Sequence, residues 1–297
     1  MGDMLKGRVA VITGAGNGLG RAYALSFAAQ GAGVVVNDIG TSHDGYGVSH
    51  DAADAVVEKI KKDSGTAVAN YGSVAVEDEA DSIIQCAIDN YGRIDVLVNN
   101  AGIIRVQDIG EINTTDWDAV IRAHLYGTFY CTRKACGYMR KQGYGRIINT
   151  SSHVGLGLKG QSTYSAAKEG ITGFSRSIAR DMAEYGVTCN IIRPVAAWRG
   201  VVQKIDAVEA LRPEDVAALV TYLASESADH INGCVFEVWR GHVGIFVEPP
   251  PVAQVLWKDG HWTPEELQQT IPGTLTKGRS REDLPYTLPW FFKPPEE

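Results

Sequence analysis

The first three quarters of the chain alternate between short apolar runs and longer amphipathic segments, and this alternation restricts the possible folds most strongly. The apolar runs are rich in valine and isoleucine, as in Gly33–Asn37, which is typical of parallel strands buried on both faces. The segments between them are long enough for helices that cross back over a sheet. We expect strands at 8–12, 33–37, 66–70, 94–98, 146–150, 187–192 and 234–238, and helices at 19–30, 51–63, 77–91, 115–141, 162–185 and 213–225. The sequence therefore predicts an α/β fold with one doubly wound parallel sheet.

The composition changes at about residue 244, where prolines and aromatic residues become frequent. One helix is expected there, at Pro264–Thr270, because Thr263 is a favourable N-cap and Pro264 suits the first helical turn. We expect a single compact domain over residues 1–243 and a Pro- and aromatic-rich C-terminal extension over residues 244–297. A lid over the site and an oligomer contact are the two roles considered for this extension.

The first expected strand leads directly into a glycine-rich turn, Thr13-Gly14-Ala15-Gly16-Asn17-Gly18-Leu19-Gly20, and then into a helix. Such glycines let the backbone approach a pyrophosphate, whose charge is stabilised at the helix N-terminus. The second strand ends at Asp38, where a carboxylate can accept hydrogen bonds from both ribose hydroxyls and repels a 2′-phosphate. The sequence thus predicts a Rossmann-type fold that binds NAD rather than NADP.

Tyr164 and Lys168 lie four residues apart in an expected helix and therefore share one face. A lysine ammonium beside a tyrosine favours the phenolate and lowers the pKa of the phenol. A tyrosine of this kind can deprotonate an alcohol or protonate a carbonyl oxygen while a hydride moves to or from a nicotinamide. We therefore expect Tyr164 and Lys168 to be catalytic, and to contact the cofactor as well.

The glycine turn, the string Ser162-Thr163-Tyr164-Ser165-Ala166-Ala167-Lys168 and the string Asn99-Asn100-Ala101-Gly102 resemble the short-chain dehydrogenase/reductase family over about residues 5–240. The resemblance implies that Asn100-Ala101-Gly102 lines the adenosine side of the cleft. It also implies a nicotinamide contact at Pro194 and Val195, where Val195 replaces the usual glycine and would offer its backbone N–H to the carboxamide. The full set of cofactor-binding residues implied in this way is Gly14, Asn17, Gly18, Leu19, Gly20, Asp38, Ser73, Val74, Asn100, Ala101, Gly102, Tyr164, Lys168, Pro194 and Val195.

The same resemblance implies a catalytic serine just after the fifth strand, and two serines adjoin there. The family's usual spacing, 13 residues before the tyrosine, favours Ser151, whereas the Ser-Ser-x-x-Gly string and the strand register favour Ser152, which we choose. His124 stands where the family usually has a catalytic asparagine that anchors a relay water through its backbone carbonyl. His124 is therefore a fourth catalytic candidate, and a plain buried helix histidine is the alternative.

Several strings, including Val36-Asn37-Asp38-Ile39-Gly40, look most like the (3R)-hydroxyacyl-CoA dehydrogenase domain of peroxisomal multifunctional enzymes. This resemblance implies an NAD-dependent oxidoreductase that interconverts a secondary alcohol and a ketone, with a 3-hydroxyacyl-CoA as candidate substrate. A hydroxysteroid or cyclic-alcohol dehydrogenase is an alternative within enzymes. A non-catalytic NAD-binding regulator is an alternative of another class, against which the trio of Ser152, Tyr164 and Lys168 argues.

Composition excludes other classes of partner. The net charge of −7 and the pI of about 5.5 argue against a nucleic-acid or anionic-membrane partner. No apolar run approaches the roughly 20 residues of a membrane-spanning helix. The five cysteines show neither a metal-binding nor a disulfide pattern, so we expect no metal and a cytoplasmic location. By its resemblance to the family the chain is expected to form a homodimer or homotetramer and to act on a small-molecule or acyl-CoA substrate.

Overall fold

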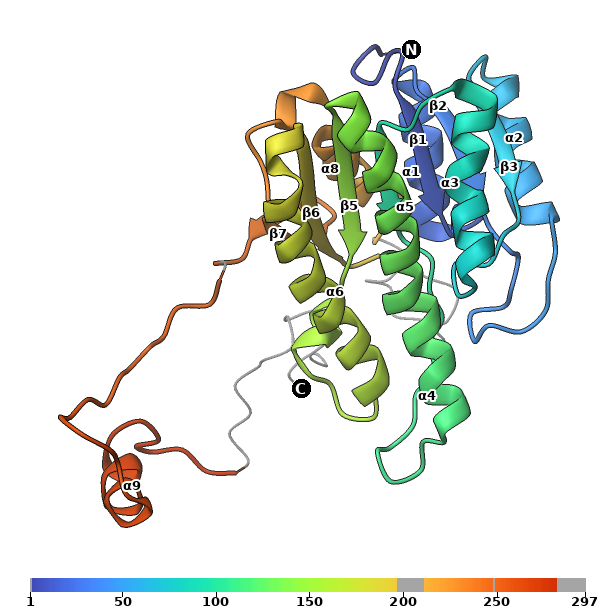
Figure 1. Ribbon diagram of the computed structural model, residues 1–297. Coiled ribbons are helices and arrows are strands. Elements are labelled where there is room, and N and C mark those ends of the chain that lie inside the picture. Colours follow the sequence, from blue (N-terminus) through green and yellow to red (C-terminus); the bar gives the residue numbers. More distant parts are fainter. Residues whose placement is uncertain (1, 197–210, 248, 282–297) are drawn as a thin grey trace. The chain divides into compact units, whose positions relative to one another are not determined.

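The computed structural model describes residues 2–196, 211–247 and 249–281, which fall into two compact units, Met1–Phe246 and Val247–Glu297 (Figure 1). The larger unit is built on an eight-stranded sheet with the order β3-β2-β1-β4-β5-β6-β7-β8. Neighbouring strands pair in parallel except β7 and β8, which are antiparallel. The strands are β1 Val9–Thr13, β2 Gly33–Asn37, β3 Thr66–Asn70, β4 Val96–Asn99, β5 Gly145–Thr150, β6 Val187–Pro194, β7 Val235–Trp239 and β8 His242–Ile245.

Helices cover both faces of this sheet (Figure 1). One apolar core joins the sheet to α1 Gly18–Ala29, α2 Asp51–Lys62 and α8 Pro213–Leu223. A second core lies on the other face, against α3 Glu77–Tyr91, α5 Gly127–Gln142 and α6 Ser162–Asp181. Because both faces are covered, Val34, Val35 and Val36 on β2 are all fully buried. The predicted doubly wound α/β fold is confirmed, and the strand order reverses between β1 and β4, where such folds bind ligands.

The structure corrects two of the predicted elements. The helix expected at 115–141 is interrupted: α4 Thr114–Ile121 is followed by a π-helical turn, Arg122–Tyr126, and only then by α5. The strand ending at 238 is not the last, because β7 turns back through Arg240 and Gly241 into β8. Arg240 has a φ of 48°, a backbone conformation that few non-glycine residues adopt, so local sequence preference did not indicate this turn.

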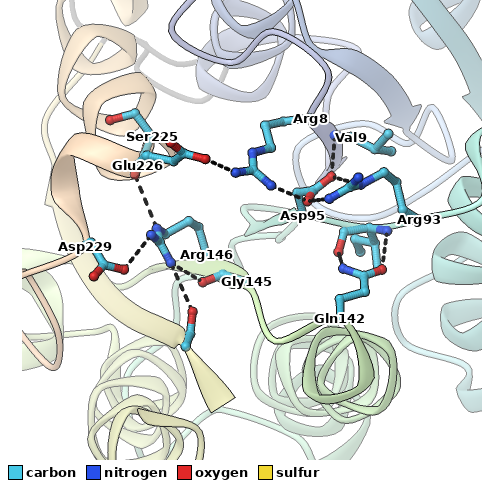
Figure 2. A network of polar contacts seen from close by, with 12 residues as sticks. Arg8, Val9, Arg93, Asp95, Gln142, Gly145, Arg146, Ser225, Glu226 and Asp229 are labelled. Atoms are coloured by element: carbon cyan, nitrogen blue, oxygen red, sulfur yellow. Dashed lines mark hydrogen bonds and ion pairs between the residues drawn. The ribbon is translucent and has the colours of Figure 1, made fainter. Parts of the chain in front are cut away.

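A network of polar contacts around two buried charged residues, Asp95 and Arg146, ties the strands together where they begin (Figure 2). Asp95, just before β4, is 0% exposed and accepts the Val9 backbone N–H at 2.9 Å. Its carboxylate also accepts hydrogen bonds from Arg8 at 3.1 Å and from Arg93 at 2.7 Å. Arg146 on β5 is likewise buried, and its guanidinium donates to the backbone oxygens of Gly145, Gly186 and Ser225 and to the carboxylate of Asp229. Because the network lies at the edge where the strands start, it stabilises the sheet at the edge opposite the carboxyl ends of the strands.

The smaller unit contains the predicted short helix, α9 Pro264–Thr270, followed by a 3-10 turn Ile271–Gly273. Thr263 and Glu266 form a capping box, in which each side chain accepts a backbone N–H of the other residue. None of the helices in the described ranges is long and apolar enough to span a membrane. All five cysteines of the chain are free thiols.

Candidate active site

The glycine-rich turn and the Asn99-Asn100-Ala101-Gly102 string hold each other at the carboxyl ends of β1 and β4. Gly14 has a φ of 64°, and a Cβ placed there would lie 2.8 Å from the Ala101 Cα. The Thr13 hydroxyl accepts the N–H groups of Asn100 at 3.0 Å and of Ala101 at 3.1 Å. The Asn100 side chain donates in turn to the carbonyls of Thr13 and Gly14. This close backbone approach requires glycine and leaves the N-terminus of α1 at the edge of the sheet, as a pyrophosphate site requires.

Asp38 follows β2 directly and lies beside the glycine turn. Its Oδ2 accepts the Gly16 N–H at 2.8 Å and its Oδ1 accepts the Gly40 N–H at 2.7 Å, and the residue is 9% exposed. A Cβ at Gly16 would lie 2.8 Å from the Asp38 Oδ2, so the absence of a side chain at 16 lets the carboxylate approach the turn. The glycine cradle and the carboxylate together fit the pyrophosphate and ribose of a dinucleotide.

Tyr164 and Lys168 share one face of α6, as their spacing predicts. The Lys168 Nζ lies 5.3 Å from the centre of the Tyr164 ring and donates to the Thr150 carbonyl at 2.7 Å. Burial lowers the pKa of Lys168 to about 7. Burial also raises the pKa of Tyr164 to about 12, against the opposing effect of a hydrogen bond with Ser152. In the chain alone, desolvation of the phenolate thus sets the pKa of Tyr164 above its usual value, and the lowering of this pKa by Lys168 stays a prediction.

The two adjacent serines after β5 have different surroundings. The Ser151 hydroxyl is 1% exposed and is held by the Lys168 carbonyl at 2.9 Å and by the Thr172 hydroxyl at 3.0 Å. Ser152 caps the 3-10 turn His153–Leu156 by accepting the Val154 N–H, and it also forms the side-chain hydrogen bond with Tyr164. The Ser151 hydroxyl is therefore engaged by α6, and the choice of Ser152 as the catalytic serine stays a prediction.

His124 lies in the π-helical turn between α4 and α5 and is 3% exposed. Its ring Nε2 lies 2.7 Å from the Ile103 carbonyl, and the ring meets that of Tyr164 edge-on at 5.1 Å. Burial lowers the pKa of His124 to about 3, so the imidazole is neutral at physiological pH. The side chain occupies the space that a Cβ at Gly102 would need. The imidazole of His124 therefore packs beside Tyr164, and a catalytic role for His124 stays a prediction.

The remaining predicted cofactor residues lie around the same edge of the sheet. The Ser73 N–H donates to Glu79, and Val74 packs against the backbone of Gly127 on α5. Pro194 ends β6. The Val195 N–H donates to the Val238 carbonyl at 3.0 Å, so the expectation that it is available for a carboxamide is wrong, because the sheet continues past the end of β6. Asn17 is the N-cap of α1 without a side-chain cap, and Leu19 packs against the core.

Sequence reasoning missed a connection across the site between the loop after β2 and the loop after β4. The Ile104 N–H donates to the His43 carbonyl at 3.1 Å, and Arg105 donates to the Asp44 carbonyl at 3.2 Å. The guanidinium of Arg105 also pairs with Asp116 on α4. The Gly-rich polar stretch at 40–49 was the available signal, but it indicated only a loop.

Comparison with known proteins adds independent information. A family model described as short chain dehydrogenase matches residues 8–207. Peroxisomal multifunctional enzyme type 2 of Mus musculus is 48% identical over 241 residues, which cover 80% of this chain and 32% of that protein. A hydroxyacyl-CoA dehydrogenase of Mycobacterium tuberculosis is 39% identical over 285 residues, covering 90% of this chain and 88% of that protein.

Among solved structures, a short chain dehydrogenase from Mycobacterium avium superposes with a TM-score of 0.83 at 44% sequence identity. The match covers 93% of this chain and 97% of that one. The chain spans only 26% to 59% of the length of the peroxisomal relatives, which carry further sequence beyond the matched region.

Proposed function

Because this chain belongs to the short-chain dehydrogenase family and is an oxidoreductase, we propose that it uses NAD to interconvert a 3-hydroxyacyl-CoA and the corresponding ketone. One observation carries the proposal: Ser152, Tyr164 and Lys168 gather at the carboxyl end of β5, in the same unit and at the same sheet edge as the glycine cradle. This arrangement provides a proton-transfer group beside a dinucleotide site, as alcohol oxidation by hydride transfer requires.

Ser152, Tyr164 and Lys168 have different roles in the transfer of one proton. In the direction of oxidation the Tyr164 hydroxyl oxygen takes the proton of the substrate alcohol, and in the direction of reduction it returns a proton to the carbonyl oxygen. The Ser152 hydroxyl holds that same oxygen by a hydrogen bond. A protonated Lys168, on the same face of α6, stabilises the phenolate. When bound, NAD supplies the hydride acceptor.

The preference for NAD over NADP rests on Asp38. Its carboxylate is held in place by two backbone N–H groups, of Gly16 and Gly40, and so cannot easily turn away. A 2′-phosphate at this position would meet a fixed negative charge in a largely buried setting, whereas ribose hydroxyls would find an acceptor.

The substrate class is supported by the relatives. The hydroxyacyl-CoA dehydrogenase of Mycobacterium tuberculosis matches almost the whole chain, and a 3-oxoacyl-[acyl-carrier-protein] reductase of Synechocystis is 41% identical over 250 residues. The first relative is named for a hydroxyacyl-CoA and the second for a 3-oxoacyl-[acyl-carrier-protein]. The proposed substrate is therefore an acyl thioester. The cytoplasmic location and the homo-oligomer stay predictions, and peroxisomal relatives make the peroxisome the competing location.

The test follows NADH formation at 340 nm over a panel of 3-hydroxyacyl-CoA thioesters, hydroxysteroids and cyclic secondary alcohols, with NAD and with NADP. Tyr164→Phe is expected to lower kcat by about 10²–10⁴-fold and to leave NAD affinity unchanged, because it removes only the proton-transfer group. Tyr222→Phe on α8 is the matched control, since it makes the same change on an element that packs on the other core. A higher kcat/KM for a hydroxysteroid than for the thioesters would contradict the proposed substrate. A higher kcat/KM with NADP than with NAD would contradict the proposed cofactor.

A further inference from the structure

The residues that directly follow Ser152 and Lys168 both point into one polar and aromatic cluster built by β6, β7 and β8. We propose that this flanking cluster positions Ser152 and Lys168 for catalysis, an inference that rests on the proposed function. The flanking cluster consists of His153, Glu169, Arg193, Glu237, Trp239, His242 and Phe246. None of these residues is required by the cofactor site or by proton transfer, and β8 was not expected from the sequence.

On the serine side, His153 fixes the turn that follows β5. It is 3% exposed, and its ring meets those of Trp239 at 5.9 Å and Phe246 at 6.0 Å. Its Nε2 lies 3.6 Å from a carboxylate oxygen of Glu237. Since His153 adjoins Ser152 in the chain, packing of this ring restrains the backbone that carries the serine hydroxyl.

The antiparallel hairpin of β7 and β8 sets the position of Glu237. The other carboxylate oxygen of Glu237 bonds to His242 Nε2 at 2.7 Å. The His242 ring stacks on Trp239 with 3.9 Å between ring centres, and these two residues are paired across the hairpin. The Glu237 carboxylate that faces His153 is thus held by His242 of β8 as well as by its own strand, β7.

On the lysine side, Glu169 pairs with Arg193 of β6 at 2.6 Å. The Arg193 side chain is 2% exposed, and its guanidinium lies 4.7 Å from the centre of the Phe246 ring, which also meets His153. A Cβ at Gly155 would lie 2.8 Å from Glu169 Oε1, so the turn after Ser152 packs directly against Glu169. The turn after Ser152 and helix α6, which carries Lys168, therefore meet in one set of contacts.

A buried ion pair is a weak device for stability, because desolvation offsets much of the attraction. The ion pair does fix the relative orientation of the two side chains. Misplacement of a catalytic group by about 1 Å can cost on the order of 10²-fold in rate. The contacts of the flanking cluster hold His153 and Glu169, the residues that follow Ser152 and Lys168 in the chain. Its members are thus positioning residues.

The test compares Glu237→Gln and Glu169→Gln, each of which keeps the side-chain shape, with the matched control Glu184→Gln at an exposed site. The proposal expects kcat to fall by about tenfold or more in the first two, an effect within the range of positioning. KM for NAD should stay within about twofold, because Asp38 and the glycine turn lie elsewhere. A kcat equal to that of Glu184→Gln in both variants overturns the proposal.

Hydrogen exchange of the same proteins gives a readout that needs no turnover. The proposal expects faster exchange at residues 153–160 in Glu237→Gln and Glu169→Gln, with no change at β1 and β2. Faster exchange throughout the sheet would indicate general destabilisation and overturn the proposal, as would a fall in kcat without any change at 153–160. If the unaltered protein turns over no member of the substrate panel, the proposed function fails, whereas the exchange result still decides whether the cluster holds the turn.

Discussion

The packing of His124 against Gly102 leads to a sharp prediction for Gly102→Ala. A Cβ at position 102 would lie 1.9 Å from Cε1 of His124, 2.6 Å from Nδ1 and 2.7 Å from Nε2. The imidazole cannot simply swing away, because it is 3% exposed, hydrogen-bonded to the Ile103 carbonyl and packed on the Tyr164 ring. The new methyl must therefore displace His124 and disturb Tyr164 beside it.

The size of the effect follows from two contributions. Overpacking a filled site costs about 1–3 kcal/mol, and losing the hydrogen bond between His124 and Ile103 costs about 1 kcal/mol more. A loss of about 2–4 kcal/mol corresponds to a Tm lower by about 4–16 °C in a domain of this size. The value of kcat should fall as well, because the ring of Tyr164 loses the surface on which it packs.

Thermal unfolding followed by circular dichroism measures this change, with Gly137→Ala as the matched control. Gly137 lies exposed on α5 with nothing within 4 Å of its added Cβ, so alanine there should raise stability by about 0.4–1 kcal/mol. In the double variant with His124→Ala the steric conflict disappears, so the two substitutions should couple by at least about 1 kcal/mol. A Gly102→Ala protein as stable as Gly137→Ala, or strictly additive effects in the double variant, would refute the reasoning.

Three further predictions concern the cofactor, the catalytic lysine and the charge network. Asp38→Ser should raise KM for NAD by about 10–100-fold, since a charged hydrogen-bond partner of the ribose is lost, and should improve the kcat/KM ratio of NADP to NAD; an unchanged ratio contradicts the role given to Asp38. Lys168 has a pKa of about 7 in the folded chain and 10.5 unfolded, so the unfolded chain binds the extra proton between these values and stability rises with pH across that window. Lys168→Met should therefore abolish turnover. Its Tm should exceed that of the unaltered protein most near pH 6, and the difference should shrink towards pH 10. A difference in Tm that does not depend on pH would exclude burial of the amine as its cause. Asp95→Asn leaves Arg8 and Arg93 without a buried anion and should cost about 3–5 kcal/mol in urea unfolding, against less than about 0.5 kcal/mol for exposed Asp259→Asn.

Local sequence was enough for the fold class and for much of the site. An uninterrupted valine run is typical of a strand buried on both faces, and Gly33–Asn37 has the bounds that this pattern predicts. Glycines in a turn between strand and helix indicate close backbone approach, and Gly14 meets Ala101 in that way. A spacing of four residues places Tyr164 and Lys168 on one helix face wherever the helix lies. The patterns behind these predictions involve only neighbours along the chain, so the sequence by itself determined the predictions.

Tertiary structure decided what depends on residues that are distant in the chain. The Ser151 hydroxyl is engaged by Lys168 and Thr172 of α6, which only folding brings to it. The Val195 N–H is bound because β7 lies beside it, and the pKa of Tyr164 rises because the surrounding fold excludes water. Strand β8 joins the sheet through pairing with β7 and brings His242 to Glu237. Burial and strand pairing are properties of the assembled molecule, since each requires groups that the chain brings together only by folding.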